Sequence, residues 1–218
     1  MELIEKSFGQ VSKNFERQYA ESLQNLLDNG VLSDNRTGIN TLSLQHQYFH
    51  IENILQSFPI IKGKKVFEKL ALKELMWMLN GRSDIEWLNE RGVKYWDKWS
   101  STGVGKHAHI PVGTIGKSYG YQMRNFNGAD QLLDTLKEMS SNPTSRRLKI
   151  SLWNPADLND TTLPPCVDYY HFGCVQMNDK KAGYYVDLHV HARSEDSFLG
   201  QPYDFMSAGW MLLIFSHI

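Results

Sequence analysis

Two long segments in the second half of the sequence, residues 169–176 and 184–192, most limit the folds open to this chain. The composition of both is typical of strands, and the turn-rich run Asn178-Asp179-Lys180-Lys181 lies between them, so we expect a hairpin. Alternation predicts a third strand over 148–153, and apolar spacing predicts helices over 67–79 and 130–139. Because these elements do not follow a regular βαβ order, the sequence predicts an α+β fold.

Patterns near the two ends of the sequence predict one further strand and one further helix. The turn-rich stretch 33–38 precedes a run with strand signals over 39–51, and the apolar segment 205–218 predicts a buried helix. With no repeat and no change of composition, we expect one domain over residues 1–218. The helix stops at Ile218 without a polar tail, so we expect that a C-terminal part of the domain is missing.

Composition limits the partners of the chain. The 218 residues are 41% hydrophobic and carry 23 basic and 24 acidic side chains, which indicates a globular protein and gives no sign of DNA or membrane binding. The first ten residues include two Glu and one Lys and have no apolar core, so we predict a cytoplasmic protein, in the host cytoplasm if it is viral. Cys166 and Cys174 are too few for a disulfide framework, and we expect free thiols.

Cys166 is the candidate nucleophile. It follows Leu163-Pro164-Pro165, and the two prolines fix φ and cannot continue a helix, so the thiol is expected at a rigid strand start. A buried structural cysteine is the alternative for any isolated thiol. The arginines Arg36, Arg146, Arg147 and Arg193 favour the functional interpretation, since guanidinium groups bind phosphate in bidentate fashion. Arg146 and Arg147 are adjacent and would point to opposite faces of a strand, unless the chain turns or a second subunit contributes.

Several motifs stand in a characteristic order along the chain: Lys73-Glu74-Leu75-Met76-Trp77-Met78-Leu79-Asn80-Gly81, Val93-Lys94-Tyr95-Trp96-Asp97-Lys98-Trp99, Tyr119-Gly120, Arg146-Arg147, Leu163-Pro164-Pro165-Cys166 and Arg193-Ser194-x-Asp196-x-x-Leu199-Gly200-x-Pro202. In kind and in order they resemble the thymidylate synthase family, from Asn35 to about Ser207.

The resemblance implies a fold and a reaction. The fold would be α+β, a mixed sheet with surrounding helices, and the protein a homodimer through the sheet face. The reaction would move a one-carbon unit from 5,10-methylenetetrahydrofolate to C5 of a pyrimidine nucleoside monophosphate, after the Cys166 thiolate adds to C6. Arg193 would favour the thiolate, Glu74 would manage protons through ordered water, and Tyr119 would help to remove the C5 proton.

The resemblance also implies binding residues for both ligands and no metal. Phosphate would be held by Arg36, Arg193 and Ser194, with the partner subunit's Arg146 and Arg147. The folate would be held by Asp196, Trp96, Gly200 and Lys64, with Lys64 at the glutamate tail; Trp96 is otherwise a core aromatic, and Glu74 a solvated helix residue.

Three departures from the family pattern concern the pyrimidine edge. Asp204 stands where thymidylate synthases have an asparagine that reads uracil, and a carboxyl there fits cytosine, as in the deoxycytidylate hydroxymethylases of this family. Val167 replaces the histidine that follows the cysteine, and His171 replaces a glutamine. Together these departures favour hydroxymethylation of dCMP, or of CMP.

Two alternatives stay open from the sequence. One is a thymidylate synthase that methylates dUMP, since Trp96 retains the aromatic of the methylating enzymes. The other is an inactive nucleotide-binding or RNA-binding relative, although such a module would have no need of the Cys166 nucleophile. The family residues that hold the ribose hydroxyl would lie beyond Ile218, so the sequence does not choose between ribose and deoxyribose.

Overall fold

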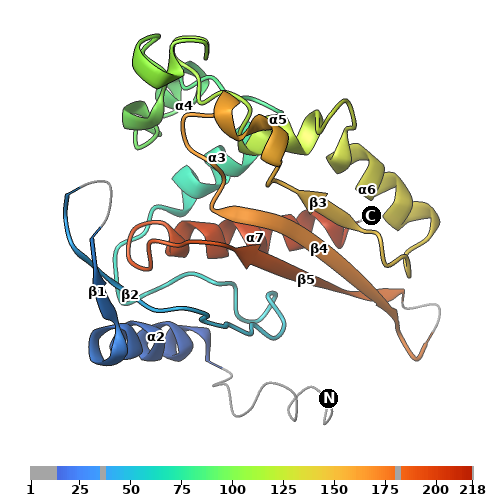
Figure 1. Ribbon diagram of the computed structural model, residues 1–218. Helices are drawn as coiled ribbons and strands as arrows, with labels where there is room; N and C mark the ends of the chain where they lie inside the picture. Colours follow the sequence, from blue (N-terminus) through green and yellow to red (C-terminus); the bar gives the residue numbers. More distant parts are fainter. Residues whose placement is uncertain (1–13, 35–37, 180–182, 218) are drawn as a thin grey trace. The chain divides into compact units, whose positions relative to one another are not determined.

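The computed structural model describes residues 14–34, 38–179 and 183–217 (Figure 1). The chain divides into two compact units. Unit 1 contains Met1–Val66 and Ser197–Phe205, and unit 2 contains Phe67–Asp196 and Met206–Ile218. That the whole chain is a single domain stays a prediction.

Unit 1 is built on helix α2, Phe15–Asn29. The Asn14 side chain caps its first turn by accepting the Arg17 N–H at 3.2 Å. Phe15 and Tyr19, one turn apart on the helix, are buried together with Ile61. The Phe205 ring completes this small core, with its centroid 4.9 Å from that of Phe15 in an edge-on contact.

The extended region of unit 1 is shorter than the sequence predicts. Strand β1, Val31–Ser33, pairs antiparallel with β2, Thr41–Ser43, and the expected strand over 39–51 is otherwise wrong. His46 has φ of 61°, a left-handed conformation that interrupts an extended chain. Helix α2 has no counterpart among the predicted elements.

Unit 2 contains the helices and strands that the sequence marks most strongly. Expected helices 67–79 and 130–139 are observed as α3, Glu68–Leu79, and α6, Gln131–Ser141. The remaining helices of the described chain are α4, Glu86–Glu90, α5, Tyr119–Arg124, and α7, Gln201–Phe215, with short 3-10 turns η1 at Asp97–Trp99, η2 at Gly105–His107 and η3 at Pro155–Asp160.

A three-stranded sheet in the order β3-β4-β5 forms the other half of unit 2. Its strands are β3, Lys149–Ser151, β4, Val167–Gln176, and β5, Tyr184–Ala192, and all pair antiparallel. The antiparallel pairing of the two hairpin strands is therefore confirmed, and so is the α+β class, while Lys180 and Lys181 of the predicted turn lie outside the described residues. The register places Val167 opposite Ala192, so the residues just outside the two strands, Cys166 and Arg193, are neighbours.

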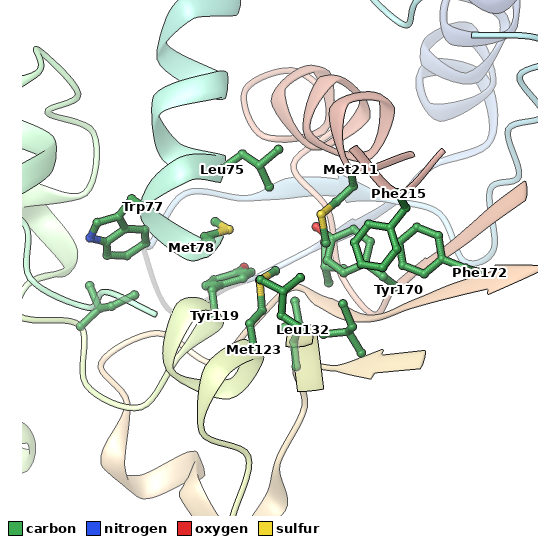
Figure 2. Close-up of a cluster of buried hydrophobic side chains, with 14 of the residues drawn as sticks. Leu75, Trp77, Met78, Tyr119, Met123, Leu132, Tyr170, Phe172, Met211 and Phe215 are labelled. Atoms are coloured by element: carbon green, nitrogen blue, oxygen red, sulfur yellow. The ribbon is translucent and has the colours of Figure 1, made fainter. Parts of the chain in front are cut away.

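The core of unit 2 lies where its helices meet one face of the sheet (Figure 2). Side chains from α3, α5, α6, α7 and β4 point toward one another there, and the Phe172 and Phe215 rings stack with centroids 3.9 Å apart. Along β4 the alternate residues Tyr170 and Phe172 enter this core. The opposite face of β4 and β5 carries exposed side chains, including Val175 and Tyr185.

Helix α7 begins four residues earlier than the apolar run 205–218 predicts. Pro202 lies in its first turn, where a missing N–H breaks no helical hydrogen bond and the fixed φ suits the helix. Asp204 is therefore a residue of a helical first turn, and its N–H bonds to the Gly200 carbonyl at 3.2 Å.

Gly120 allows α5 to approach the end of α3 very closely. A Cβ at this position would lie 2.6 Å from the Arg82 carbonyl oxygen and 2.9 Å from that of Met78. Both obstacles are backbone atoms that cannot move aside, so a side chain would push the helices apart. The neighbour of Gly120 is Tyr119, whose position consequently depends on this contact.

Candidate active site

Cys166 lies immediately before strand β4, and hydrogen bonds fix the peptide groups on both of its sides. Its N–H donates to the Tyr119 phenolic oxygen at 2.8 Å. Its carbonyl oxygen accepts from the Arg193 N–H at 2.9 Å. The residue itself is partly exposed. The backbone is thus held while the thiol remains accessible to a ligand, as a nucleophile requires.

The Arg193 side chain folds back over the segment that precedes Cys166. Nε donates to the Pro165 carbonyl at 2.8 Å and an Nη donates to the Pro164 carbonyl at 3.1 Å. The guanidinium carbon also lies 4.9 Å from the centre of the Trp153 ring. Stacking and two hydrogen bonds keep this permanent positive charge beside the cysteine at an exposed position.

Tyr119 connects Cys166 to the core of unit 2. Its ring is 7% exposed and packs edge-on against Trp96, with centroids 5.8 Å apart, while its hydroxyl bonds to Cys166. In Figure 2 the ring lies among the core side chains between α3 and α5. A shift of α5 would therefore move both the phenol and the cysteine backbone.

Glu74 is a buried carboxylate on α3, 8% exposed. Oε2 accepts from the Tyr95 hydroxyl at 2.8 Å, and Oε1 accepts from the indole N–H of Trp96. Since burial of an unpaired carboxylate is costly, these donors explain how an acid is kept on the inner face of α3. Interpreting Glu74 as a solvated helix residue is wrong.

A polar network supports the loop that leads into Cys166. The Asp157 carboxylate, 8% exposed, accepts from Gln122 at 3.0 Å and from Asn154 at 2.9 Å, and it also binds Lys117 at 2.9 Å. Hydrogen bonds to Asp160 and Asp157 raise the pKa of Lys117 well above its usual range. These bonds join the η3 turn, which precedes the loop, to α5 and to the segment just before α5.

An open hollow of about 390 Å³ lies beside Arg193 on the sheet, lined by Lys149, Ser151, Trp153, Asp168, Tyr169 and Arg193. Two cations and two aromatic rings make it suitable for an anionic ligand or a polar partner surface. Asp168 Oδ2 and His191 Nδ1 are hydrogen-bonded, with 2.7 Å between the two atoms. Its buried Oδ1 has no hydrogen-bond partner in the described chain.

The other predicted residues of unit 2 are at its surface. Arg146 and Arg147 are both exposed in a turn before β3, so the expectation that strand geometry forces them apart does not apply. Ser194 and Asp196 are exposed in the segment that follows β5. Trp96, in contrast, is buried, with 6% of its surface exposed.

The remaining predicted residues lie in unit 1 or outside the described residues. Lys64 donates to the Phe198 carbonyl, and its ammonium nitrogen is 3.9 Å from the centre of the Phe198 ring. Gly200 lies just before α7, and Asp204 lies in the first turn of this helix. Arg36 lies in the segment 35–37, outside the described residues.

Three residues of the site were not identified from the sequence as functional: Tyr95, Trp153 and Asp168. Tyr95 stands beside Trp96 in the motif that carries the family resemblance, but its hydroxyl points to a residue 21 positions away. Trp153 and Asp168 lie on two different strand ends, and nothing in their spacing relates them to Arg193 before the sheet is assembled.

No group of three or more His, Cys, Asp or Glu side chains in residues 14–34, 38–179 and 183–217 could hold a metal ion. Over the same ranges no helix is both long and apolar enough to cross a bilayer.

The α+β fold thus brings together a partly exposed cysteine that is a candidate nucleophile, an arginine beside it, and a buried carboxylate and phenol behind it. Comparison with known families matches residues 17–218 to the family described as thymidylate synthase. A similar protein is the thymidylate synthase of Malacoplasma penetrans (strain HF-2), 30% identical over 214 residues, which span 88% of this chain and 71% of that protein.

The chain belongs to the thymidylate synthase family. It is therefore a one-carbon transferase that uses methylenetetrahydrofolate as co-substrate and acts at C5 of a pyrimidine nucleotide.

Proposed function

We propose that this chain hydroxymethylates C5 of a cytidine monophosphate, dCMP or CMP, through a bond between the Cys166 sulfur and C6 of the ring. The observation that carries the choice of base is Asp204, an acid at the position where the resemblance to thymidylate synthases has an asparagine. Asp204 lies in the first turn of helix α7, and its backbone N–H bonds to the Gly200 carbonyl.

The chemistry of the pyrimidine edge supports cytosine. Uracil presents a carbonyl and an N–H, which an amide matches, whereas cytosine presents an amino group and a bare N3. A carboxyl accepts from the amino group and shares a proton with N3, so Asp204 fits cytosine. The mismatched base would leave buried polar groups unsatisfied at about 1–3 kcal/mol each. A proton at N3 would also make C6 more electrophilic.

The neighbours of Cys166 agree with a changed base edge. Val167 is buried in the core, where the resemblance has a histidine that belongs to the network around the uracil 4-position. His171 stands where the family has glutamine. Both substitutions remove groups associated with uracil, although neither on its own specifies cytosine.

The geometry around Cys166 supports the covalent step. Addition of its thiolate to C6 makes C5 a carbon nucleophile. The Arg193 charge, held next to the cysteine by the Pro164 and Pro165 carbonyls, favours the thiolate and suits a nearby phosphate. The Tyr119 oxygen lies at the Cys166 backbone, so C5 of a ring bonded to the sulfur would be near this phenol.

Proton transfer at the ring is assigned to Glu74 and Tyr119. Glu74 is buried and held by two donors, so it can accept and return a proton through water without changing its position. Tyr119 is proposed to assist removal of the C5 proton. Both side chains belong to the same buried cluster as Trp96.

The folate supplies the one-carbon unit when it is bound. Asp196 is an exposed carboxylate that suits the donor groups of a pterin ring, whereas Trp96 is largely buried and is proposed beside the folate because of its motif. Lys64 is a half-exposed cation that suits the glutamate tail. Gly200 is proposed beside the folate because of its motif alone.

We further propose a homodimer through the exposed sheet face, in which the partner subunit's Arg146 and Arg147 help to bind phosphate. Support comes from the exposed Val175 and Tyr185 on β4 and β5, and from the exposed turn that carries both arginines. Arg36, Arg193 and Ser194 are the other proposed phosphate ligands, so the site would combine groups from several segments.

Methylation of dUMP is the second candidate, favoured by the similar protein named thymidylate synthase and by the retained Trp96. An inactive binding protein is a weaker alternative. A module that only binds has no use for a cysteine whose two peptide groups are fixed by a tyrosine and an arginine.

The test is tritium release from C5 of labelled dCMP, CMP and dUMP with methylenetetrahydrofolate, followed by the mass of the product. We expect release from a cytidine nucleotide and a hydroxymethyl product. Asp204→Asn should move the preference toward dUMP by about tenfold or more.

Asp28→Asn, which makes the same change at an exposed position of α2, serves as the control and should leave the preference unchanged. Release from dUMP alone by the unaltered chain would overturn the choice of base. Release from none of the three nucleotides would favour an inactive relative.

A further inference from the structure

Tyr95 contacts the proposed proton-transfer residue but has no assigned part in the reaction. Its hydroxyl donates to Glu74 Oε2 at 2.8 Å, while Glu74 Oε1 receives the indole N–H of Trp96. Tyr95 and Trp96 are consecutive, so one short segment before the η1 turn supplies a donor to each oxygen of the carboxylate. With one donor on each oxygen, the carboxylate group of Glu74 is held in one orientation.

The two donors are chemically different. An indole N–H can only donate, whereas a phenolic hydroxyl donates to a carboxylate and can also accept from a protonated carboxyl. Tyr95 can therefore keep its hydrogen bond when a proton moves on or off Oε2, and Trp96 holds Oε1 in place meanwhile. Hydrogen bonds to an ionised acceptor are the stronger ones, so Tyr95 favours the charged form of Glu74 overall.

We propose that Tyr95 is a positioning residue that keeps Glu74 ionised and oriented for proton transfer at the pyrimidine ring. The proposal rests on the one-carbon transfer at Cys166 proposed above, because it requires that Glu74 exchange protons during turnover. Tyr95 acts on the reaction through its hydrogen bond to Glu74.

The other titratable groups along these contacts are the Tyr119 phenol, which packs against Trp96, and the Cys166 thiol beyond it. On α3 the Lys73 ammonium is directed elsewhere and donates to the Arg91 carbonyl at 2.6 Å. Of these groups, Glu74 is the one whose carboxylate bonds directly to the Trp96 indole N–H, so a titration followed at that indole reports on Glu74.

The first test measures the ionisation of the Glu74 carboxyl and does not require turnover. The chain has six tryptophans, and the Trp96 indole N–H, identified by its loss in Trp96→Phe, bonds directly to Glu74. Its ¹⁵N–¹H chemical shift should follow the ionisation of the carboxyl. In Tyr95→Phe one stabilising donor is removed, so the titration midpoint should move up by about one pH unit.

The second test measures the rate of the reaction. In the tritium-release assay Tyr95→Phe should lower kcat by roughly tenfold, with KM for the nucleotide within about twofold, and should move the acidic limb of the rate profile to higher pH. Glu74→Gln should lower kcat by more than Tyr95→Phe does. Adding Tyr95→Phe to Glu74→Gln should cause no further loss, because the tyrosine acts only through the carboxylate.

Tyr48→Phe is the matched control, since the Tyr48 side chain is 76% exposed, and it should change neither the titration nor the rate. An unmoved midpoint in Tyr95→Phe, or an equal additional loss in the Glu74→Gln background, would overturn the proposal. If the unaltered chain releases no tritium, the proposed function fails, while the titration still decides the role of Tyr95.

Discussion

At the scale of single residues, the two cysteines show how position determines chemistry. Cys166 is at a strand start beside Arg193, whereas Cys174 lies on β4 with its side chain partly buried against the core of unit 2. Burial, with a smaller contribution from the Asp187 charge, raises the pKa of the Cys174 thiol. Only a thiolate is a good nucleophile, so Cys174 should be the slower of the two.

Alkylation with iodoacetamide at pH 8, followed by peptide mass analysis, should therefore label Cys166 about tenfold faster than Cys174. The raised pKa leaves Cys174 with a smaller thiolate fraction at this pH, and the difference should narrow as the pH rises toward the pKa of Cys174. Cys166→Ser should abolish the fast phase and leave the slow one. Equal rates for both cysteines at pH 8 would contradict the assignment.

At the scale of elements, α6 shows how one side chain can start a helix and join it to another. Asp130 caps α6 by accepting the Leu133 N–H at 3.0 Å, and it receives Arg124 from α5 at 2.7 Å. Burial opposes its ionisation, but the hydrogen bonds from Arg124 and Leu133 prevail and lower the pKa of Asp130 below 3.8. The carboxylate thus joins the helix that carries Tyr119 to its neighbour.

Asp130→Ala should lower the free energy of unfolding by about 1–2 kcal/mol at pH 7, measured by urea denaturation. Asp130→Asn retains a capping oxygen and should lose less than about 1 kcal/mol, because the ion pair with Arg124 is partly solvent-screened. The charge of Asp130 stabilises the fold above pH 3.8 and this contribution disappears as the pH falls through the lower native pKa. The unaltered chain and Asp130→Asn should therefore converge as the pH falls through the native pKa of Asp130; a constant difference would contradict the charge effect.

At the scale of the whole molecule, the proposed exchange of arginines between subunits makes each active site depend on two chains. A mixture of Cys166→Ala with an Arg146→Ala/Arg147→Ala double variant should form heterodimers in which one of the two sites is intact. Random pairing makes half of the dimers mixed, so tritium release should recover to roughly a quarter of the unaltered level.

Each variant should be inactive or strongly impaired by itself. If the arginines served their own subunit, every site in the mixture would lack either the thiol or the arginines, and activity would not recover. Asp28→Asn mixed with Cys166→Ala provides the reference for subunit exchange alone, since its own sites are complete.

Agreement between sequence and structure is strongest where a pattern is local. Asp130 and the periodic leucines of α6, and the hairpin strands β4 and β5, were predictable because caps and alternation depend on neighbours in the chain. Where backbone conformation is decided by packing, prediction was wrong: His46 ends the expected strand over 39–51, and α7 begins at Gln201.

The sequence by itself determined the family, and it singled out the candidate nucleophile Cys166 and the unusual acid Asp204, because residue types in a fixed order carry that information. Only the tertiary structure decided that the Cys166 backbone bonds to Tyr119, that Arg193 folds onto two prolines and that Tyr95 and Trp96 hold Glu74. These contacts join residues 21 to 47 positions apart, and their hydrogen bonds form only once burial and helix packing bring those segments together.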